Sequence, residues 1–382
     1  MKISINLKIL LLMIGLLAYF PPYYLEYRPY GAILDDIFLI IRFLISMFYS
    51  YKYFYIEKHF LDLFIFLFLV SQAISSIATE TTTIGFIGSQ FLLFGFYLFL
   101  KFNLLKNSES FLKSAFNLFI IYILFQVASQ HFYIQGFDLQ NAYGDARAYF
   151  LGRKNATTPY LIYLLTTYYL LNKQMTKIIS IKELTFLTFT LLLTLFTSSS
   201  TALMCFITFI LIRFFGSSER ISNSYTKIVA TIYLILSSAI LSSESSLVSK
   251  IMGILFGKSS FSGRTEIWSL AIRYFKENLW FGYGLNISFI PWTNGAIVYS
   301  AHNTLLDILA RYGVITGVIF LIILLSQVLF KTSLKYRTLL ALLIPFLLYL
   351  LMENASTVMF ILVITTTYYL NLKMGETDAK IS

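Results

Sequence analysis

The stretch LTFLTFTLLLTLFTSSSTALMCFITFILIRFF, residues 184–215, is apolar at both ends and polar in its middle. As one helix it would extend roughly 48 Å, whereas about 20 helical residues cross the bilayer hydrocarbon. The polar centre is Thr197–Thr201, and basic residues stand beyond both ends. Because cytoplasmic loops accumulate Lys and Arg, we expect both ends to face the cytoplasm. The stretch is therefore predicted to be a hairpin of two membrane helices.

A second long apolar run, residues 338–372, has the same pattern, with Glu353 and Asn354 at its centre and basic residues on both sides. Other apolar runs of about spanning length cover residues 7–25, 31–51, 60–79, 84–104, 111–130, 157–172, 226–243 and 312–330. The sequence therefore predicts an all-α polytopic membrane protein with about twelve transmembrane helices. We expect residues 1–382 to form a single integral membrane domain with both termini in the cytoplasm.

The composition agrees with a chain that is dissolved in lipid. Hydrophobic residues make up 58% and charged residues 12% of the 382, about half the charged share of soluble domains. The formal net charge of +11 is explained by basic cytoplasmic loops, so no nucleic-acid partner is expected. One cysteine, and three histidines without a carboxylate cluster, favour neither a disulfide nor a metal site. The first apolar run lacks a small-residue cleavage site and is predicted to stay as a helix.

Polar chemistry outside the cytoplasm is concentrated in two predicted loops, residues 131–156 and the large late loop 244–311. Within the second, Arg264–Phe281 has an amphipathic helical pattern, and its apolar face carries Ile267, Trp268, Ala271, Ile272, Phe275 and Leu279. Such a helix is predicted to lie along the membrane surface and to end at Gly282. Arg264 begins it. Its guanidinium and the free N–H groups could bind an anion, or the side chain could extend to the headgroups.

His302 is the second candidate in this loop, directly before the next membrane helix. A neutral imidazole could take a proton from a hydroxyl near pH 7, or His302 could only cap or anchor that helix. Asn303 follows it, and we assign this residue a supporting role. Asp307 and Arg311 are four residues apart, and pairing on one helix face is favoured because an unpaired charge near the bilayer is costly.

The earlier loop contains Arg147, Arg153 and Lys154 within eight positions. Such a group suits a diphosphate, although ordinary solvated loop charges are an equal alternative. Glu353, in the turn of the second hairpin, is either a counter-charge for one of the arginines or only a turn residue.

Three motifs together resemble a known family: SGRTEIW at 262–268, GYG at 282–284, and AHNTLLDILARYG at 301–313 before an apolar helix. They resemble the shared core of the O-antigen polymerase and ligase superfamily, which includes Wzy-type repeat polymerases, O-antigen ligases and related oligosaccharyltransferases. A weaker similarity covers Arg147–Tyr160. The resemblance implies a metal-independent, inverting glycosyltransferase of the membrane-embedded (GT-C-like) class, without a cofactor, at the periplasmic face of a bacterial inner membrane.

The resemblance also implies roles for single residues. Arg264 would bind the pyrophosphate of an undecaprenyl-pyrophosphate-linked oligosaccharide, and His302 would activate the acceptor hydroxyl. The family's upstream arginine corresponds to Arg147, with Arg153 as the competitor. Many relatives carry an arginine where this chain has Ser200, so either another arginine supplies that charge or the alignment is shifted at this position, and the number of arginines that contact phosphate stays open.

The function expected from this resemblance is polymerisation of lipid-linked O-antigen or capsular repeat units, with lipid-linked oligosaccharide as donor and acceptor. An O-antigen ligase or a protein O-oligosaccharyltransferase is the alternative, because they differ only in acceptor. A flippase is less favoured, since Arg42 is the only basic residue well inside a predicted span. Membrane lipid is an expected partner, and a chain-length regulator is a further candidate.

Overall fold

The structure is a computed structural model. It describes residues 6–27, 30–133, 136, 147–172, 179–215, 264–290, 298–329 and 337–379, and the single positions 231, 233, 235 and 237. The predicted span 226–243 lies almost entirely outside these residues, and so do parts of the loops 131–156 and 244–311. The described chain is nearly all helix.

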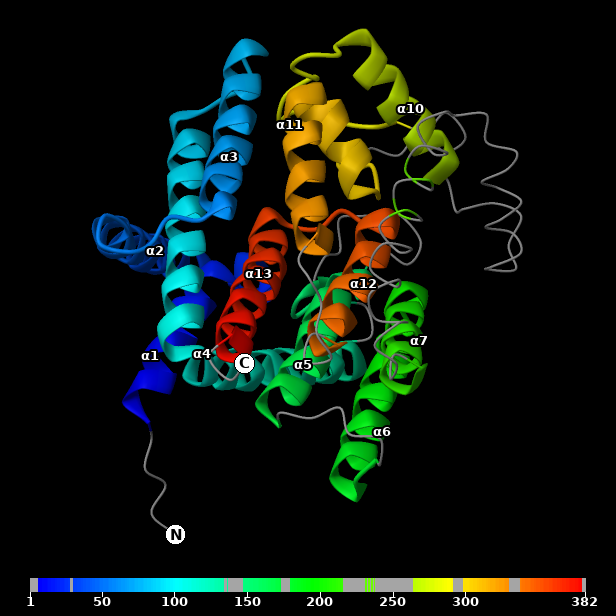
Figure 1. Cartoon of the computed structure of the whole chain (residues 1–382). Helices are drawn as coiled ribbons and strands as arrows, with labels where there is room; N and C mark the ends of the chain where they lie inside the picture. The colour runs from blue at the N-terminus through cyan, green and yellow to red at the C-terminus, as the bar shows by residue number, and fades with distance from the viewer. Residues whose placement is uncertain are drawn as a thin grey trace.

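The N-terminal helices follow the predicted spans. They are α1 (Leu7–Tyr19), α2 (Gly31–Tyr53), α3 (Phe60–Ala78) and α4 (Ile84–Phe132), with a short 3-10 helix η1 (Tyr23–Tyr27) after the first. The two predicted spans 84–104 and 111–130 form one continuous element of 49 residues. Asn107 interrupts it with φ −139° and ψ 38°. Figure 1 shows the first part of α4 beside α3 and the second part turned across the bottom of the molecule.

Both predicted hairpins are confirmed. The first consists of α6 (Ile181–Phe196) and α7 (Ser200–Phe215), and the second of α12 (Arg337–Met352) and α13 (Thr357–Ala379). Ser198, at the first turn, has a positive φ of 52°. Ser199 then caps α7 by accepting a hydrogen bond from the N–H of Ala202 at 3.1 Å, because the first N–H groups of a helix need outside partners.

A small hairpin precedes the fifth helix. Strands β1 (Ala148–Tyr149) and β2 (Gly152–Arg153) pair antiparallel, and the 3-10 turn η2 (Lys154–Thr157) leads into α5 (Thr158–Leu171). The second part of α4 holds the hairpin in place. Its Ser129 hydroxyl and Gln126 side-chain carbonyl accept hydrogen bonds from the N–H groups of Phe150, at 3.1 Å, and Leu151, at 2.6 Å.

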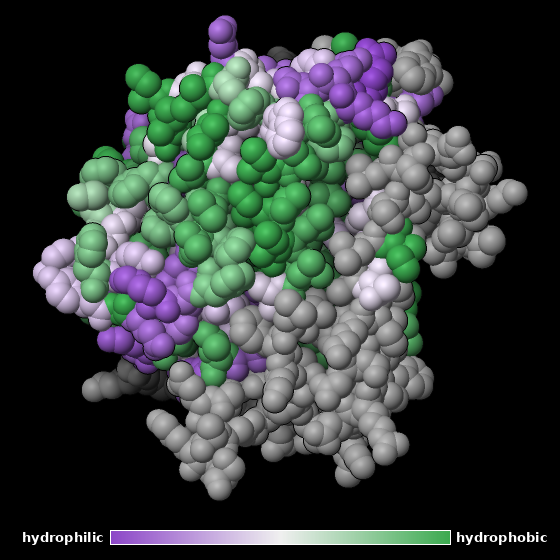
Figure 2. Space-filling model, turned by 45° about the horizontal axis from the view of Figure 1, so that its top comes forward, coloured by the Kyte–Doolittle hydropathy of each residue, from purple (hydrophilic) through white to green (hydrophobic). Residues whose placement is uncertain are grey.

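The protein is an all-α, multi-pass membrane protein. Within the described residues, α3, α4 and α11 (Thr304–Leu329) are long and apolar enough to cross a membrane. Shorter apolar helices cover Leu7–Tyr19, Ser200–Phe214, Thr338–Met352 and Thr357–Lys373. Large apolar side chains are exposed on α1, α3, α4, α7 and α11, and Figure 2 shows a broad hydrophobic surface between two hydrophilic areas. Such a surface suits lipid. The count of twelve stays a prediction, because it includes residues 226–243.

The amphipathic helix is confirmed as α10 (Arg264–Glu277), but its apolar face is covered by protein. Ile267, Trp268 and Ile272 are buried in one cluster with Leu306 and other residues of α11. Figure 1 shows α10 beside α11. The prediction that this face rests on the membrane surface needs correction, because amphipathic periodicity does not distinguish burial against a helix from burial in lipid.

The GYG motif, which follows α10, packs against α11: the N–H groups of Tyr283 and Gly284 donate to the carbonyls of Ala310 and Arg311. Gly282 has φ +63°, and a Cβ there would lie 2.4 Å from the carbonyl carbon of Arg311. Gly313 has φ +75° and bends α11, and a Cβ there would lie 2.1 Å from the Trp280 oxygen. Since only glycine adopts this backbone freely and admits such close contact, these glycines are required for the packing that places the start of α11.

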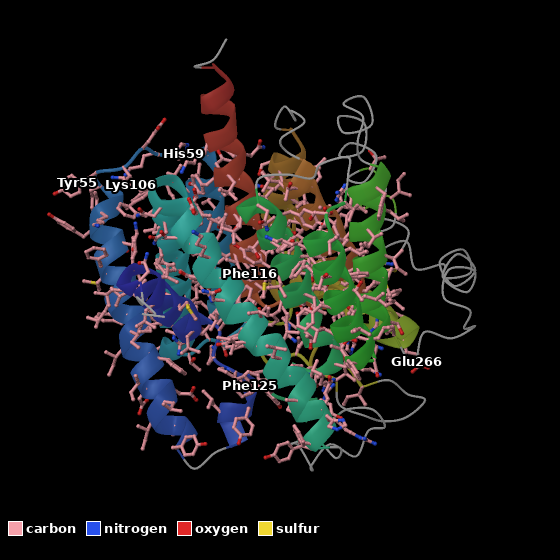
Figure 3. The ribbon with its side chains drawn as sticks, turned by 90° about the horizontal axis from the view of Figure 1, so that it is seen from below. Tyr55, His59, Lys106, Phe116, Phe125 and Glu266 are labelled. Atoms are coloured by element: carbon pink, nitrogen blue, oxygen red, sulfur yellow. The ribbon has the colours of Figure 1, made fainter. Side chains whose placement is uncertain are left out.

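The predicted cytoplasmic and outer segments lie apart. Figure 3 shows Tyr55, His59 and Lys106, all near predicted cytoplasmic turns, at one corner, and Glu266 of α10 at the opposite corner. This separation agrees with opposite membrane sides, although which side is cytoplasmic stays a prediction.

Candidate functional site

Glu353, in the turn between α12 and α13, lies at the centre of a polar cluster. Its Oε1 accepts hydrogen bonds from Arg264 Nη2 at 2.5 Å and from Asn155 Nδ2 at 2.6 Å. His302 Nδ1 lies 3.1 Å from the other carboxylate oxygen, Oε2. Two main candidates from the late loop are therefore brought together by a residue that follows them in the chain. Glu353 is therefore a counter-charge for Arg264 of the late loop, whereas the sequence interpretation had considered the arginines of the earlier loop.

Arg264 is held at the first residue of α10 by two acceptors. Besides the ion pair with Glu353, its Nη1 donates to the carbonyl of Met352 at 2.8 Å. That carbonyl ends α12 and belongs to the groups that a helix end leaves unpaired. The side chain is 14% exposed, and its charge neutralises the buried carboxylate of Glu353.

His302 has an unusual backbone, with a positive φ of 49°. This conformation is costly for residues other than glycine, and it persists only where the surroundings enforce it. Its neighbour Asn303 does this from both ends: Oδ1 accepts from the N–H of Leu306 at 3.0 Å, and Nδ2 donates to the carbonyl of Leu351 at 3.1 Å. The imidazole is 28% exposed, and its position is therefore fixed while the ring remains accessible.

Thr304 fastens the start of α11 to the Glu353 turn. Its hydroxyl donates to the carbonyl of Glu353 at 2.9 Å and accepts from the N–H of Ala355 at 3.1 Å. Sequence reasoning did not single out Thr304, because a threonine at a helix start is too common to signal anything beyond a cap.

Asn155 and Ser199 complete the cluster from two further elements. The Ser199 hydroxyl donates to Asn155 Oδ1 at 2.8 Å, which orients the Asn155 amide toward Glu353. In the sequence, Asn155 only falls within the weaker family similarity at Arg147–Tyr160, and Ser199 only falls within the polar centre Thr197–Thr201. Ser200, at the expected arginine position, is exposed at the start of α7.

The charge state of Glu353 follows from its surroundings. Burial opposes ionisation, but the hydrogen bond from His302 and the charge of Arg264 outweigh it, so the pKa of Glu353 lies below its ordinary value of 4.5. An ionised carboxylate only accepts hydrogen bonds. This assigns a proton to His302 Nδ1 and, in the neutral ring, an unprotonated Nε2 on the opposite side.

Asp307 and Arg311 form the predicted pair, with 2.8 Å between Arg311 Nε and Asp307 Oδ2. Asp307 Oδ1 also accepts from the N–H of Ala301 at 2.9 Å, and Arg311 donates to the carbonyls of Leu285 and Tyr299. These bonds hold the segment that leads to His302, which agrees with a supporting role.

Arg147 and Arg153 are exposed at the two ends of the small hairpin. Arg147 precedes β1, and Arg153 ends β2, two residues before Asn155. The hairpin therefore presents an arginine close in sequence to a residue of the cluster. Which of the two binds phosphate stays a prediction.

Comparison with known proteins agrees with this geometry. Residues 185–321 match the family model described as O-antigen ligase, Wzy_C. The chain carries a domain of the O-antigen polymerase and ligase superfamily. No curated protein and no solved structure matches it. The matched range contains Ser199, Arg264 and His302, whereas Asn155 and Glu353 lie outside it.

The resemblance found in the sequence is thus confirmed, and the protein is a glycan-transferring membrane enzyme of the O-antigen ligase or polymerase type. In the described residues, no three His, Cys, Asp or Glu side chains gather where they could hold a metal ion. The roles of single residues remain to be proposed from the geometry.

Proposed function

We propose that this protein polymerises lipid-linked oligosaccharide repeat units at the periplasmic face of a bacterial inner membrane. The growing glycan would leave undecaprenyl pyrophosphate and join the next lipid-linked repeat. The observation that carries the proposal is the Glu353 cluster, because it orients a histidine base and an arginine at one accessible place within the family domain.

His302 would act as the general base. The ionised Glu353 accepts a hydrogen bond from the Nδ1–H of His302, so the unprotonated Nε2 can accept the proton of an acceptor hydroxyl. The hydroxyl oxygen then forms a bond to the anomeric carbon of the donor. The bond from that carbon to the pyrophosphate oxygen breaks, and the pyrophosphate leaves with the electron pair. Attack from the face opposite the leaving group would invert the anomeric configuration.

The arginines would stabilise the departing pyrophosphate, whose negative charge grows in the transition state. Arg264 and His302 share the partner Glu353, and the Arg264 side chain is 14% exposed. Arg147 or Arg153, on the hairpin that carries Asn155, would add a second cation. Guanidinium groups suit this task because they bind phosphate oxygens in pairs. The reaction as written needs no metal and no cofactor.

A ligase is the second candidate, favoured by the description of the family that matches residues 185–321. It would use the same groups and transfer finished glycan to lipid A-core or to protein. Deletion of the gene separates the two. Loss of long chains with single repeats still on the core supports the polymerase. Loss of all surface glycan with accumulated lipid-linked polymer overturns it and supports the ligase.

The direct test is the purified full-length protein with a defined undecaprenyl-pyrophosphate-linked repeat, with and without a chelator. Chains of several repeats in both conditions are the expected result. Activity that disappears with the chelator and returns with a divalent metal would overturn the metal-independent mechanism.

A further inference from the structure

A cavity of about 230 Å³ lies beside the Glu353 cluster, between α3, α11 and the turn that leads into α13. Its wall includes Thr304 and Ala355, the two residues that tie the start of α11 to the Glu353 turn. The cavity is smaller than the roughly 300–1,000 Å³ of sites for drug-sized molecules. It therefore suits one small ring rather than an extended oligosaccharide.

One side chain in this cavity lacks the partner that its burial calls for. Gln72 of α3 lines the cavity, is 3% exposed and makes no hydrogen bond to any residue that the structure describes. Buried amides are almost always hydrogen-bonded, because burying one without a partner costs free energy. The Gln72 amide, with two donors and an acceptor, is therefore available to a molecule in the cavity.

The charges in the wall favour a neutral ligand. Arg311 lies against Asp307, and Asp307 Oδ2 also accepts from Asn354 Nδ2 at 3.0 Å. The arginine charge is thus compensated within the wall, and a phosphate would meet a carboxylate. A polyhydroxylated molecule meets no such repulsion and can both donate to Asp307 and accept from the amides.

The wall also has an aromatic part. Phe68, Phe320 and Phe360 form a cluster with ring centroids 4.9–6.2 Å apart. Aromatic side chains and several hydrogen-bonding groups in one cavity fit a pyranose, which has C–H faces and a rim of hydroxyls. Water alone would satisfy the polar side but not the aromatic one.

We propose that this cavity binds a single neutral sugar ring of the acceptor and thereby brings the acceptor next to His302. The proposal rests on the proposed function, since only a glycan acceptor gives the ring a role there. Gln72 is then a specificity-determining residue, although the nearest family motif begins 190 positions after it, at residue 262.

The first experiment measures binding without turnover. Neutral monosaccharides, released by acid hydrolysis of the host's surface glycan, are added to the detergent-solubilised full-length protein and followed by ligand-observed NMR. Gln72→Met removes the amide at nearly constant size. Gln90→Met, at a buried glutamine of α4 that does not line the cavity, is the matched control, and Phe360→Leu is a second cavity variant.

Sugar binding weakened about fivefold, the loss of roughly one hydrogen bond, in Gln72→Met but not in Gln90→Met supports the proposal. Weaker binding in Phe360→Leu supports it as well. Equal binding in all variants, or no sugar binding to the wild type, overturns it. So does inorganic pyrophosphate binding that depends on Gln72, because it would assign the cavity to a phosphate.

The second experiment separates this inference from the function itself. In the transfer assay, Gln72→Met should raise the KM for the acceptor about fivefold and change kcat less than twofold. If Gln72→Met transfers glycan with an unchanged KM for the acceptor, the cavity proposal is wrong and the proposed function still holds. If sugar binding depends on Gln72 but the wild type transfers no glycan, the proposed function is wrong and the sugar site still holds.

Discussion

Two buried ion pairs have similar geometry and differ in their surroundings. Lys101 Nζ lies 2.6 Å from Asp62 Oδ2, and the two side chains are 0% and 3% exposed. Arg264 Nη2 lies 2.5 Å from Glu353 Oε1, and the two side chains are 14% and 8% exposed. The first pair joins the consecutive helices α3 and α4, and the second joins α10 to the turn between α12 and α13. The short N–O distance alone does not tell which pair acts on a substrate.

The Lys101–Asp62 pair is closed. Asp62 also accepts from the hydroxyls of Tyr97 and Tyr369 and from the N–H of His59, and Lys101 donates to the carbonyl of Glu57. Such a pair fastens α3 to α4 and α13. Because Asp62 and Lys101 make these hydrogen bonds inside the protein, the pair is not available to bind a ligand.

The Arg264–Glu353 pair is open on one side. It holds His302, whose ring is 28% exposed and whose Nε2 receives no hydrogen bond from the described residues. A buried ion pair therefore indicates a functional site when it orients a third group that remains accessible to a substrate. Variants of the open cluster should change catalysis, and variants of the closed one should change stability.

The largest effect is expected for His302→Ala. Removing a positioned general base should lower kcat by about 10²- to 10⁴-fold and leave the melting temperature nearly unchanged, because the ring is partly exposed. Rates of transfer from a defined lipid-linked repeat measure this. His131→Ala, at an exposed histidine of α4, is the control. Polymer formed at the wild-type rate by His302→Ala would remove His302 from the mechanism.

The closed pair should respond in the opposite way. Asp62→Asn leaves the Lys101 charge buried without its partner and should cost about 3–5 kcal/mol of stability, with kcat per folded molecule within twofold of the wild type. Thermal unfolding in detergent gives the first quantity and the transfer assay the second. Glu109→Gln breaks the exposed pair with Lys113 and should cost less than about 1 kcal/mol. A larger loss of kcat than of stability in Asp62→Asn would contradict the contrast.

Much of the fold could be predicted from local patterns. Apolar runs gave the helices, and the polar centres at Thr197–Thr201 and at Glu353 gave both hairpins, because a helix longer than the bilayer must turn at polar residues. The sequence did not predict that α4 continues through the bend at Asn107, since two apolar runs separated by polar residues favour a loop between two helices. The sequence also did not predict that the apolar face of α10 is buried against α11, because amphipathic periodicity does not show what an apolar face packs against.

The site was predictable where a motif carried it and not where only folding assembles it. Arg264 and His302 stand in family motifs, and the i to i+4 spacing of Asp307 and Arg311 predicted their pair. Asn155 and Ser199 have no such spacing with Glu353. They are 198 and 154 positions from it. Only the folded packing brings Asn155 of η2 to Glu353, and Ser199, before α7, to Asn155.

Glu353→Gln should sharpen the open side of the comparison with a smaller effect. A glutamine keeps the shape but no longer fixes the Nδ1 proton of His302, so kcat should fall about 10²-fold, at the low end for acid–base groups. Stability should fall less than in Asp62→Asn, because Arg264 and His302 can turn to solvent. An unchanged rate would show that the carboxylate does not orient the base.

The same variant carries a pH prediction. Because the pKa of Glu353 is held below its ordinary value of 4.5, the ionised carboxylate stabilises the fold fully above about pH 4.5. That contribution is lost as the pH falls through the lower pKa of the folded state. Thermal unfolding between pH 3 and 7 should therefore show an acid decline in the wild type that is weaker in Glu353→Gln. Identical declines would assign the acid sensitivity to other groups.

The smallest effect is expected for Ser199→Ala. The variant loses the hydrogen bond to Asn155 and the cap of α7, which together should cost about 1–2 kcal/mol of stability. The Asn155 amide then keeps its contact with Glu353 but can rotate, so kcat should fall only a few-fold. Ser180→Ala removes the comparable cap of α6 far from the cluster, and it should lower stability to a similar degree without changing kcat. If both variants lower kcat equally, Ser199 acts only through helix stability, and the open cluster ends at Asn155.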